Sequence, residues 1–183
     1  QWQPRASREA VYAGESAGLE YLRATGASVR PYQHGDLRSA DVLVAGPGSA
    51  QALSGDEQAI SRWLSGGGRV VGFGLASDDV RWLPQAPRTK PTEHIDAFFT
   101  AFERGSPFVG ISPADVHNRD PRELPLVIPS EGWRVFGNGV LAQSTDGSVA
   151  LSQIAPWQFR GTNQAQLRRT YRRRSEEHTS ELQ

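Results

Sequence analysis

Short apolar runs alternate with amphipathic stretches over the first half of the chain. The apolar runs at residues 9–14, 41–46 and 69–74 predict strands, and the last two are continuous enough to be covered on both faces of a sheet. The run 27–32 alternates and contains Pro31, which favours an edge strand.

Between these runs the apolar positions follow a helical period. Leu19 and Leu22 predict a helix with Ser16 as its cap, and a second helix opens at Ser54 or Asp56. The apolar face of the second helix consists of Ala59, Ile60, Trp63 and Leu64. Helices that join successive strands at short spacing indicate right-handed crossovers and a parallel sheet. We therefore expect an open three-layer α/β fold of flavodoxin-like kind, with ligands near the carboxyl ends of its strands.

The pattern changes after residue 83. Residues 88–90 predict an edge strand, and residues 106–130, with five of the 12 Pro, predict an extended surface crossing. Residues at helical spacing predict a short amphipathic helix between them: Ile95, Phe98, Phe99 and Phe102. The runs 133–136, 139–142 and 148–154 predict closing strands, with a hairpin turn at Asp146-Gly147 joining the last two.

This organisation predicts one α/β domain over residues 9–159, followed by an Arg-rich tail or linker over residues 160–173. Residues 174–183 resemble a translated sequencing adapter, and we leave them out of the fold prediction. The 183-residue chain begins at Gln1 and contains no Met, so we expect a fragment of a larger protein of metagenomic origin.

Composition excludes several kinds of chemistry. The chain has no Cys, which rules out a disulfide, a thiolate nucleophile and a thiolate metal site. Its 20 basic and 20 acidic residues cancel, so no overall field favours nucleic acid or an anionic membrane, and we expect neither as a partner. Compartment is left open, because many secreted domains also lack Cys.

Two glycine-containing turns follow predicted strands. Neither Gly46-Pro47-Gly48 nor Gly72-Phe73-Gly74 continues to the third Gly of a dinucleotide-binding loop, so tight turns are favoured over a nucleotide cofactor. The histidines show no metal-ligand spacing. We expect no cofactor and no metal.

The strand and helix order, with Gly66-Gly67-Gly68 before the strand at 69–74, resembles the class I glutamine amidotransferase-like domain. Together with Ala155-Pro156-Trp157-Gln158-Phe159 and Leu167-Arg168-Arg169-Thr170-Tyr171, it is similar to the non-catalytic, trimerisation-type domains of β-galactosidase-like glycoside hydrolases. Active amidotransferases of this class have a Cys at the turn that follows the buried strand, where this chain has Gly74, and a His-x-Glu pair that has no counterpart here. The resemblance therefore implies an amidotransferase-like fold without acyl-transfer activity.

One polar cluster could still form a site: Asp115, His117, Asn118, Arg119 and Asp120. There the imidazole of His117 would serve in proton transfer or hydrogen bonding, and Arg119 would donate to an anion or a hydroxyl. The alternative is a surface loop whose polar groups bond to one another. Ser77, and the neighbouring pair Asp78 and Asp79, are interpreted as helix-capping residues.

The tryptophans divide into two groups. Trp63, Trp82 and Trp133 are expected in the core, whereas Trp157 and Phe159 are expected to be exposed and to contact a partner.

The leading hypothesis is a non-catalytic accessory domain of a β-galactosidase-like glycoside hydrolase in carbohydrate metabolism. Its partners would be other domains of the same polypeptide or a homo-oligomer, with carbohydrate as a further ligand. The alternative is a small hydrolase or a sugar-binding module that uses the 115–123 loop around His117.

Overall fold

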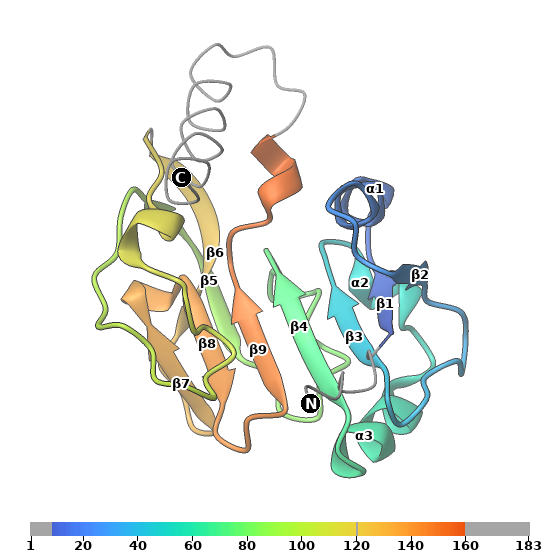
Figure 1. Ribbon diagram of the computed structural model, residues 1–183. Coiled ribbons are helices and arrows are strands. Elements are labelled where there is room, and N and C mark those ends of the chain that lie inside the picture. The colour runs from blue at the N-terminus through green and yellow to red at the C-terminus, as the bar shows by residue number, and fades with distance from the viewer. Residues whose placement is uncertain (1–8, 120, 160–183) are drawn as a thin grey trace, which may run out of the picture.

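A seven-stranded sheet forms the centre of the computed structural model, which describes residues 9–119 and 121–159 (Figure 1). Its strand order is β2-β1-β3-β4-β9-β8-β7. The parallel strands are β1 (Ala10–Ala13), β2 (Val29–Pro31), β3 (Val42–Ala45), β4 (Arg69–Phe73) and β9 (Val149–Ser152). The strands β7 (Trp133–Phe136) and β8 (Leu141–Ser144) close the sheet in antiparallel pairing.

The parallel part has the 2-1-3-4-5 order of a flavodoxin-like sheet, with β9 as the fifth strand. The predicted fold class is therefore confirmed: an open, mainly parallel α/β sheet with antiparallel closing strands. The edge position of β2 is confirmed as well, and so is the turn at Asp146-Gly147 between β8 and β9.

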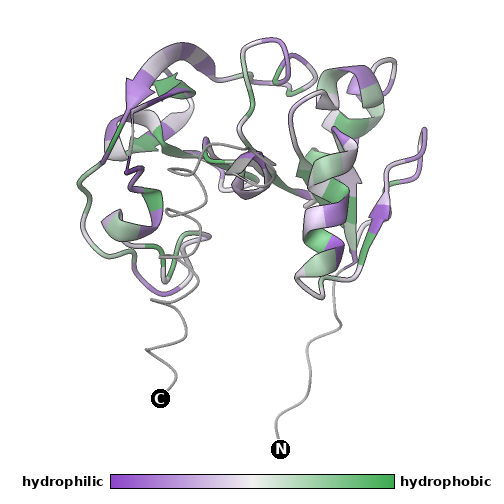
Figure 2. Cartoon of the chain, turned by 90° about the horizontal axis from the view of Figure 1, so that it is seen from above, coloured by the Kyte–Doolittle hydropathy of each residue, from purple (hydrophilic) through white to green (hydrophobic). Residues whose placement is uncertain are grey.

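Elements cover both faces of the sheet, as Figure 2 shows in a view from above. Helix α1 (Ser16–Ala24) packs on one face, where its apolar residues meet Tyr12 and Val44. Helices α2 (Ser49–Ala52) and α3 (Glu57–Ser65) lie on the other face, and Ile60 of α3 is fully buried against Leu43 and neighbouring core residues. Successive strand residues point to opposite faces, which is why one strand supplies both cores.

The helix starts differ from the prediction in detail. Ser16 is the first residue of α1 rather than its cap, and Glu15 occupies the cap position without a side-chain capping bond. Asp56 precedes α3 as expected, but its carboxylate bonds to other groups. Residues 77–80 form turns, so no helix begins there for Ser77 and Asp78 to cap. Asp79 Oδ1 instead accepts from the backbone N–H of Gly48, at the start of α2, at 2.9 Å.

The region after β4 departs most from the prediction. Strand β5 (Arg88–His94) extends the expected 88–90 edge and pairs along its length with β6 (Arg122–Ile128) in a separate two-stranded sheet. The proposed crossing at 106–130 is thus partly wrong, because it contains β6 and the short 3-10 helix η1 (Pro113–Val116). Two further 3-10 turns follow, η2 (Gly137–Gly139) and η3 (Pro156–Phe159).

The expected helix around 95–102 is wrong, since residues 96–103 have no regular secondary structure. Phe102 instead packs its ring against three others, with centroids 5.2 Å from Phe99, 5.3 Å from Phe108 and 5.2 Å from Phe136. The aromatic spacing therefore reflects side chains that reach inward from an irregular segment. Tertiary packing outweighs helical propensity here.

Candidate functional site

A cluster of aromatic side chains occupies the carboxyl ends of the parallel strands, where an open α/β sheet usually binds its ligand. We refer to this cluster, Trp157 with Tyr12, Tyr21 and Phe73, as the aromatic plug. Trp157 of η3 is only 4% exposed. Its ring centroid lies 6.2 Å from that of Tyr12, 5.9 Å from that of Tyr21 and 5.7 Å from that of Phe73. The expectation that Trp157 is exposed for partner contact is therefore wrong, because the rings of β1, α1 and β4 enclose it. The side chain of Phe159 lies outside the described part of the chain.

Hydrogen bonding and close backbone approach fix this plug. The Trp157 Nε1–H donates to Glu15 Oε1 at 2.5 Å. A Cβ at Gly18 would lie 2.0 Å from the Tyr12 hydroxyl, and one at Gly46 would lie 2.3 Å from the same atom. The ring of Tyr12 therefore fits only because both neighbouring positions lack a side chain.

The Tyr12 hydroxyl is buried and has no hydrogen-bond partner among the described residues. Burial raises the pKa of Tyr12 well above its ordinary value, and the charge of Glu15 raises it further. The group is thus a neutral filler of the crevice and is unsuited to act as a base near neutral pH.

The turn after β4 carries no reactive group. Gly74 has a left-handed backbone with φ of +61°, and a Cβ there would lie 3.1 Å from the Cβ of Ala155. The buried side-chain amide of Gln153 makes two hydrogen bonds to the backbone of Leu75, the residue after Gly74. It accepts from Leu75 N–H at 3.0 Å and donates to Leu75 C=O at 3.2 Å. Gly74, the position at which the sequence resemblance implies a missing thiol, thus lies in a turn whose backbone N–H donates to Ser152 C=O at 2.8 Å.

The described residues of the polar loop at 115–123 lie in different surroundings. The carboxylate of Asp115 accepts hydrogen bonds from Ser112, from its backbone N–H at 2.8 Å and its hydroxyl at 2.7 Å, which closes a capping box at η1. His117 and Arg119 are exposed, whereas Asn118 is buried. Asp120 lies outside the described residues.

Asn118 nevertheless stands out within this loop. Its side chain is 1% exposed, and neither its Oδ1 nor its Nδ2 has a hydrogen-bond partner among the described residues. Its backbone N–H donates to Ile95 C=O at 2.6 Å, and the nearby buried His94 bonds through Nε2 to Val116 C=O at 2.8 Å. Asn118 therefore faces the interior, away from the exposed positions of His117 and Arg119.

Sequence reasoning missed a cluster around Asp56. The buried carboxylate oxygen Oδ2 of Asp56 lies 2.8 Å from His34 Nδ1 and accepts from the Tyr32 hydroxyl at 2.5 Å and from Gly35 N–H at 3.2 Å. Burial raises the pKa of Tyr32, and its hydrogen bond to Asp56 adds to this effect. His34 itself is 78% exposed.

This cluster can hold and orient an imidazole, but in the part of the chain that the structure describes no nucleophilic hydroxyl is hydrogen-bonded to His34. No sequence signal identifies it, because 22 positions separate His34 from Asp56 and the two meet only where the segment after β2 contacts the start of α3.

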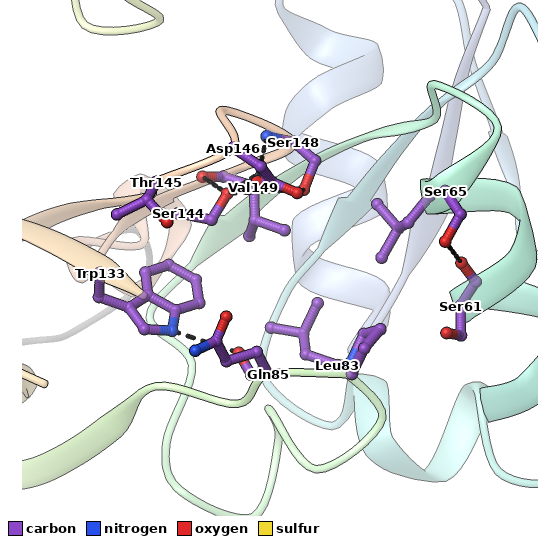
Figure 3. Close-up of a pocket in the computed structure, with 12 residues that line it drawn as sticks. Ser61, Ser65, Leu83, Gln85, Trp133, Ser144, Thr145, Asp146, Ser148 and Val149 are labelled. Atoms are coloured by element: carbon purple, nitrogen blue, oxygen red, sulfur yellow. Dashed lines mark hydrogen bonds between the residues drawn. The ribbon is translucent and has the colours of Figure 1, made fainter. Parts of the chain in front are cut away.

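A cavity of about 230 Å³ lies at the opposite edge of the sheet (Figure 3). It is bounded by the C-terminal half of α3, the turn before β5 and the β8–β9 hairpin. Its lining comprises Ser61, Leu64, Ser65, Leu83, Pro84, Gln85, Trp133, Ser144, Thr145, Asp146, Ser148 and Val149. None of these residues was predicted as a site, because they come from four separate segments of the sequence.

Metal-ligating and membrane-spanning features are both missing from residues 9–119 and 121–159. Within that part, no three His, Asp or Glu side chains gather in a way that could hold a metal ion. No helix there combines the length and apolar character that a membrane span requires.

Comparison with known proteins does not assign the chain to a family. No protein-family model matches the sequence, and no curated protein matches it. Among solved structures, the chain is similar to a protein of Thermoplasma acidophilum described as a putative GMP synthase subunit, with 10% identity over 92% of each chain and a TM-score of 0.49. The fold class follows from the strand order and directions described above, and a likeness of this degree carries nothing further.

Proposed function

We propose that this chain is a non-catalytic accessory domain of a larger glycoside-hydrolase-related protein. It packs against another domain of the same polypeptide or against a second copy of the chain. The link to glycoside hydrolases rests on the sequence resemblance at 155–159 and 167–171. The non-catalytic character is supported by Gly74 at the turn after β4 and by Trp157, which fills the usual ligand crevice.

The observation that carries the docking role is an exposed set of large apolar side chains on the β5–β6 connection. Phe98 is 83% exposed, Val109 is 56% exposed and Ile95 is 40% exposed. We refer to these three residues as the 95–109 surface. Contiguous exposed apolar patches mark interaction sites, whereas scattered apolar residues do not, so the docking role requires these three side chains to act as one patch.

The connection that bears the 95–109 surface is held in place. Phe99 and Phe102 follow Phe98 in the sequence, and both pack against the same buried cluster as Phe136. The exposure of Phe98 therefore belongs to an anchored segment. This surface replaces Trp157 as the proposed partner contact.

Hydrogen–deuterium exchange tests the docking role. The backbone of residues 95–111 should exchange several-fold more slowly in a longer polypeptide that contains this chain, or at concentrations where the chain self-associates, than in the dilute chain alone. The variant Phe98→Ser should abolish that protection, whereas Arg62→Ser, on the exposed side of α3, should leave it unchanged. Equal exchange of 95–111 in all these states would refute the docking role.

Activity assays test the non-catalytic part separately. We expect no release of ammonia from glutamine and no cleavage of nitrophenyl glycosides by the chain. Turnover that disappears in His117→Ala would instead establish the hydrolase alternative at the 115–123 loop.

A further inference from the structure

The cavity between α3 and the β8–β9 hairpin has the chemistry of a small polar-ligand site. Five of its twelve lining residues carry hydroxyl groups: Ser61, Ser65, Ser144, Thr145 and Ser148. Apolar walls accompany them, formed by Leu83, Val149 and the indole of Trp133. Figure 3 shows the indole on one side of the space and Ser61 and Ser65 on the other.

Several polar atoms at this cavity are not used by the protein. Among the described residues, the hydroxyls of Ser61 and Thr145 have no hydrogen-bond partner. The side chain of Gln85 uses only its Nε2, which donates to Glu131 C=O at 3.2 Å, while its backbone C=O accepts from the Trp133 indole. These donors and acceptors come from α3, the β8–β9 hairpin and the turn before β5. They are therefore placed around one volume by tertiary packing.

A fixed carboxylate lies at the same cavity. Asp146 Oδ1 accepts from the Ser144 hydroxyl at 2.5 Å and from the Ser148 backbone N–H at 2.9 Å. The Ser148 hydroxyl lies 2.8 Å from Oδ1 and 2.9 Å from Oδ2. Because Oδ2 makes only this one contact, it can accept a further hydrogen bond.

The charge around Asp146 favours a neutral ligand. The hydrogen bonds from Ser144 and Ser148 lower its pKa, and the nearby positive charge of Arg69 contributes in the same direction. The carboxylate is thus ionised near neutral pH, and the positive charge of Arg69 already offsets part of its charge. A hydroxyl group satisfies such a carboxylate without requiring a second positive charge.

The size of the cavity and its combination of polar and apolar walls restrict the class of ligand further. The cavity, at about 230 Å³, lies below the range of roughly 300–1,000 Å³ that is common for drug-sized ligands. A ring with an apolar face and hydroxyls at its edge matches an indole and aliphatic wall facing serine and threonine hydroxyls. We propose that this cavity binds a single sugar-sized, neutral polyhydroxylated ligand.

This site is independent of the 95–109 surface, since the two share no residue. Calorimetry and NMR titration of the whole 183-residue chain with D-galactose test it, with cyclohexanol as a probe of similar ring size that lacks all but one of the hydroxyls. We expect a millimolar dissociation constant for the sugar, as is usual for so small a ligand. The indole N–H resonance of Trp133 should shift during the same titration, and cyclohexanol should bind at least tenfold more weakly.

Two variants separate binding from folding. Ser65→Phe places an aromatic ring at the cavity from an exposed helix position, and should lower sugar affinity at least tenfold. Ser54→Phe makes the same change at an exposed position outside the cavity, and should bind as the unmodified chain does. Asp146→Asn removes the charge and should also weaken binding, with circular dichroism showing that each variant is folded.

The proposal is overturned by any of three results. These are no saturable binding of D-galactose, D-glucose or xylitol up to about 100 mM, equal affinity for cyclohexanol and the sugar, and unchanged sugar binding in folded Ser65→Phe. Failure here would leave the docking role untouched, because the exchange experiment reads different residues.

Discussion

The aromatic plug at the carboxyl edge provides the sharpest test of the structure. Replacing Trp157 by Ala removes a ring that is 4% exposed and that contacts three other aromatic rings. Truncating a buried Trp to Ala costs about 3–5 kcal/mol, and aromatic pairs contribute about 0.5–1.5 kcal/mol each beyond the area that they bury. We therefore expect Trp157→Ala to lower the free energy of unfolding by about 4 kcal/mol.

The conservative change separates the ring from its hydrogen bond. Trp157→Phe keeps a ring in the plug but loses the Nε1–H that donates to Glu15. Because Glu15 is exposed, its carboxylate can bond to water instead, and the loss should be about 1 kcal/mol for the hydrogen bond. The reduced size of the ring adds to this cost, but the total should stay well below that of the Ala variant.

Urea unfolding followed by circular dichroism measures both changes. With a slope of about 2 kcal/mol per molar urea, Trp157→Ala should shift the midpoint by about 2 M. The matched control is Phe98→Ala, which removes an aromatic ring that is 83% exposed and should change stability by less than about 0.5 kcal/mol. If Trp157→Ala were as stable as that control, the ring would not fill the crevice and the carboxyl edge would be open to ligand.

Three further predictions follow from individual positions. Gly74→Cys should lower stability by about 1 kcal/mol or more in thermal unfolding, because φ is +61° and its Cβ meets Ala155, and it should yield no glutaminase activity. Asn118→Leu should leave stability unchanged or raise it by about 1–3 kcal/mol in urea unfolding, since it removes a buried unpartnered amide; marked loss would show that the amide is bonded. The pKa of Asp146 is lower folded than unfolded, so its stabilisation is present above about pH 3.9 and is lost as the pH falls through the folded value. Asp146→Asn should therefore flatten the acid-side decline in unfolding free energy, and an unchanged pH profile would contradict this.

The parallel core of this protein could be predicted from the amino-acid pattern alone. Continuous apolar runs separated by amphipathic helices leave few ways to bury both faces of a sheet, and right-handed crossovers then restrict the strand order. Pro31 marked β2 as an edge, and Asp146-Gly147 marked the β8–β9 hairpin, because turn and edge chemistry is local.

Polar and aromatic segments were decided by the tertiary structure. Strand β5 contains Lys90, Thr92 and Glu93, and no apolar period announces its full length; backbone pairing with β6 defines it. The spacing of Phe99 and Phe102 fits a helix equally well, but contacts with Phe136, more than thirty positions away, select an irregular segment.

The candidate sites depend on tertiary contacts even more than the fold does. Sequence reasoning predicted Trp157 to be exposed, because nothing local indicates that Tyr12, Tyr21 and Phe73 surround it. The cavity at Asp146 and the Asp56 cluster each join segments that lie far apart along the chain. The spacing of apolar residues indicates which residues are buried. Which residues then become neighbours depends on how the helices pack against the sheet.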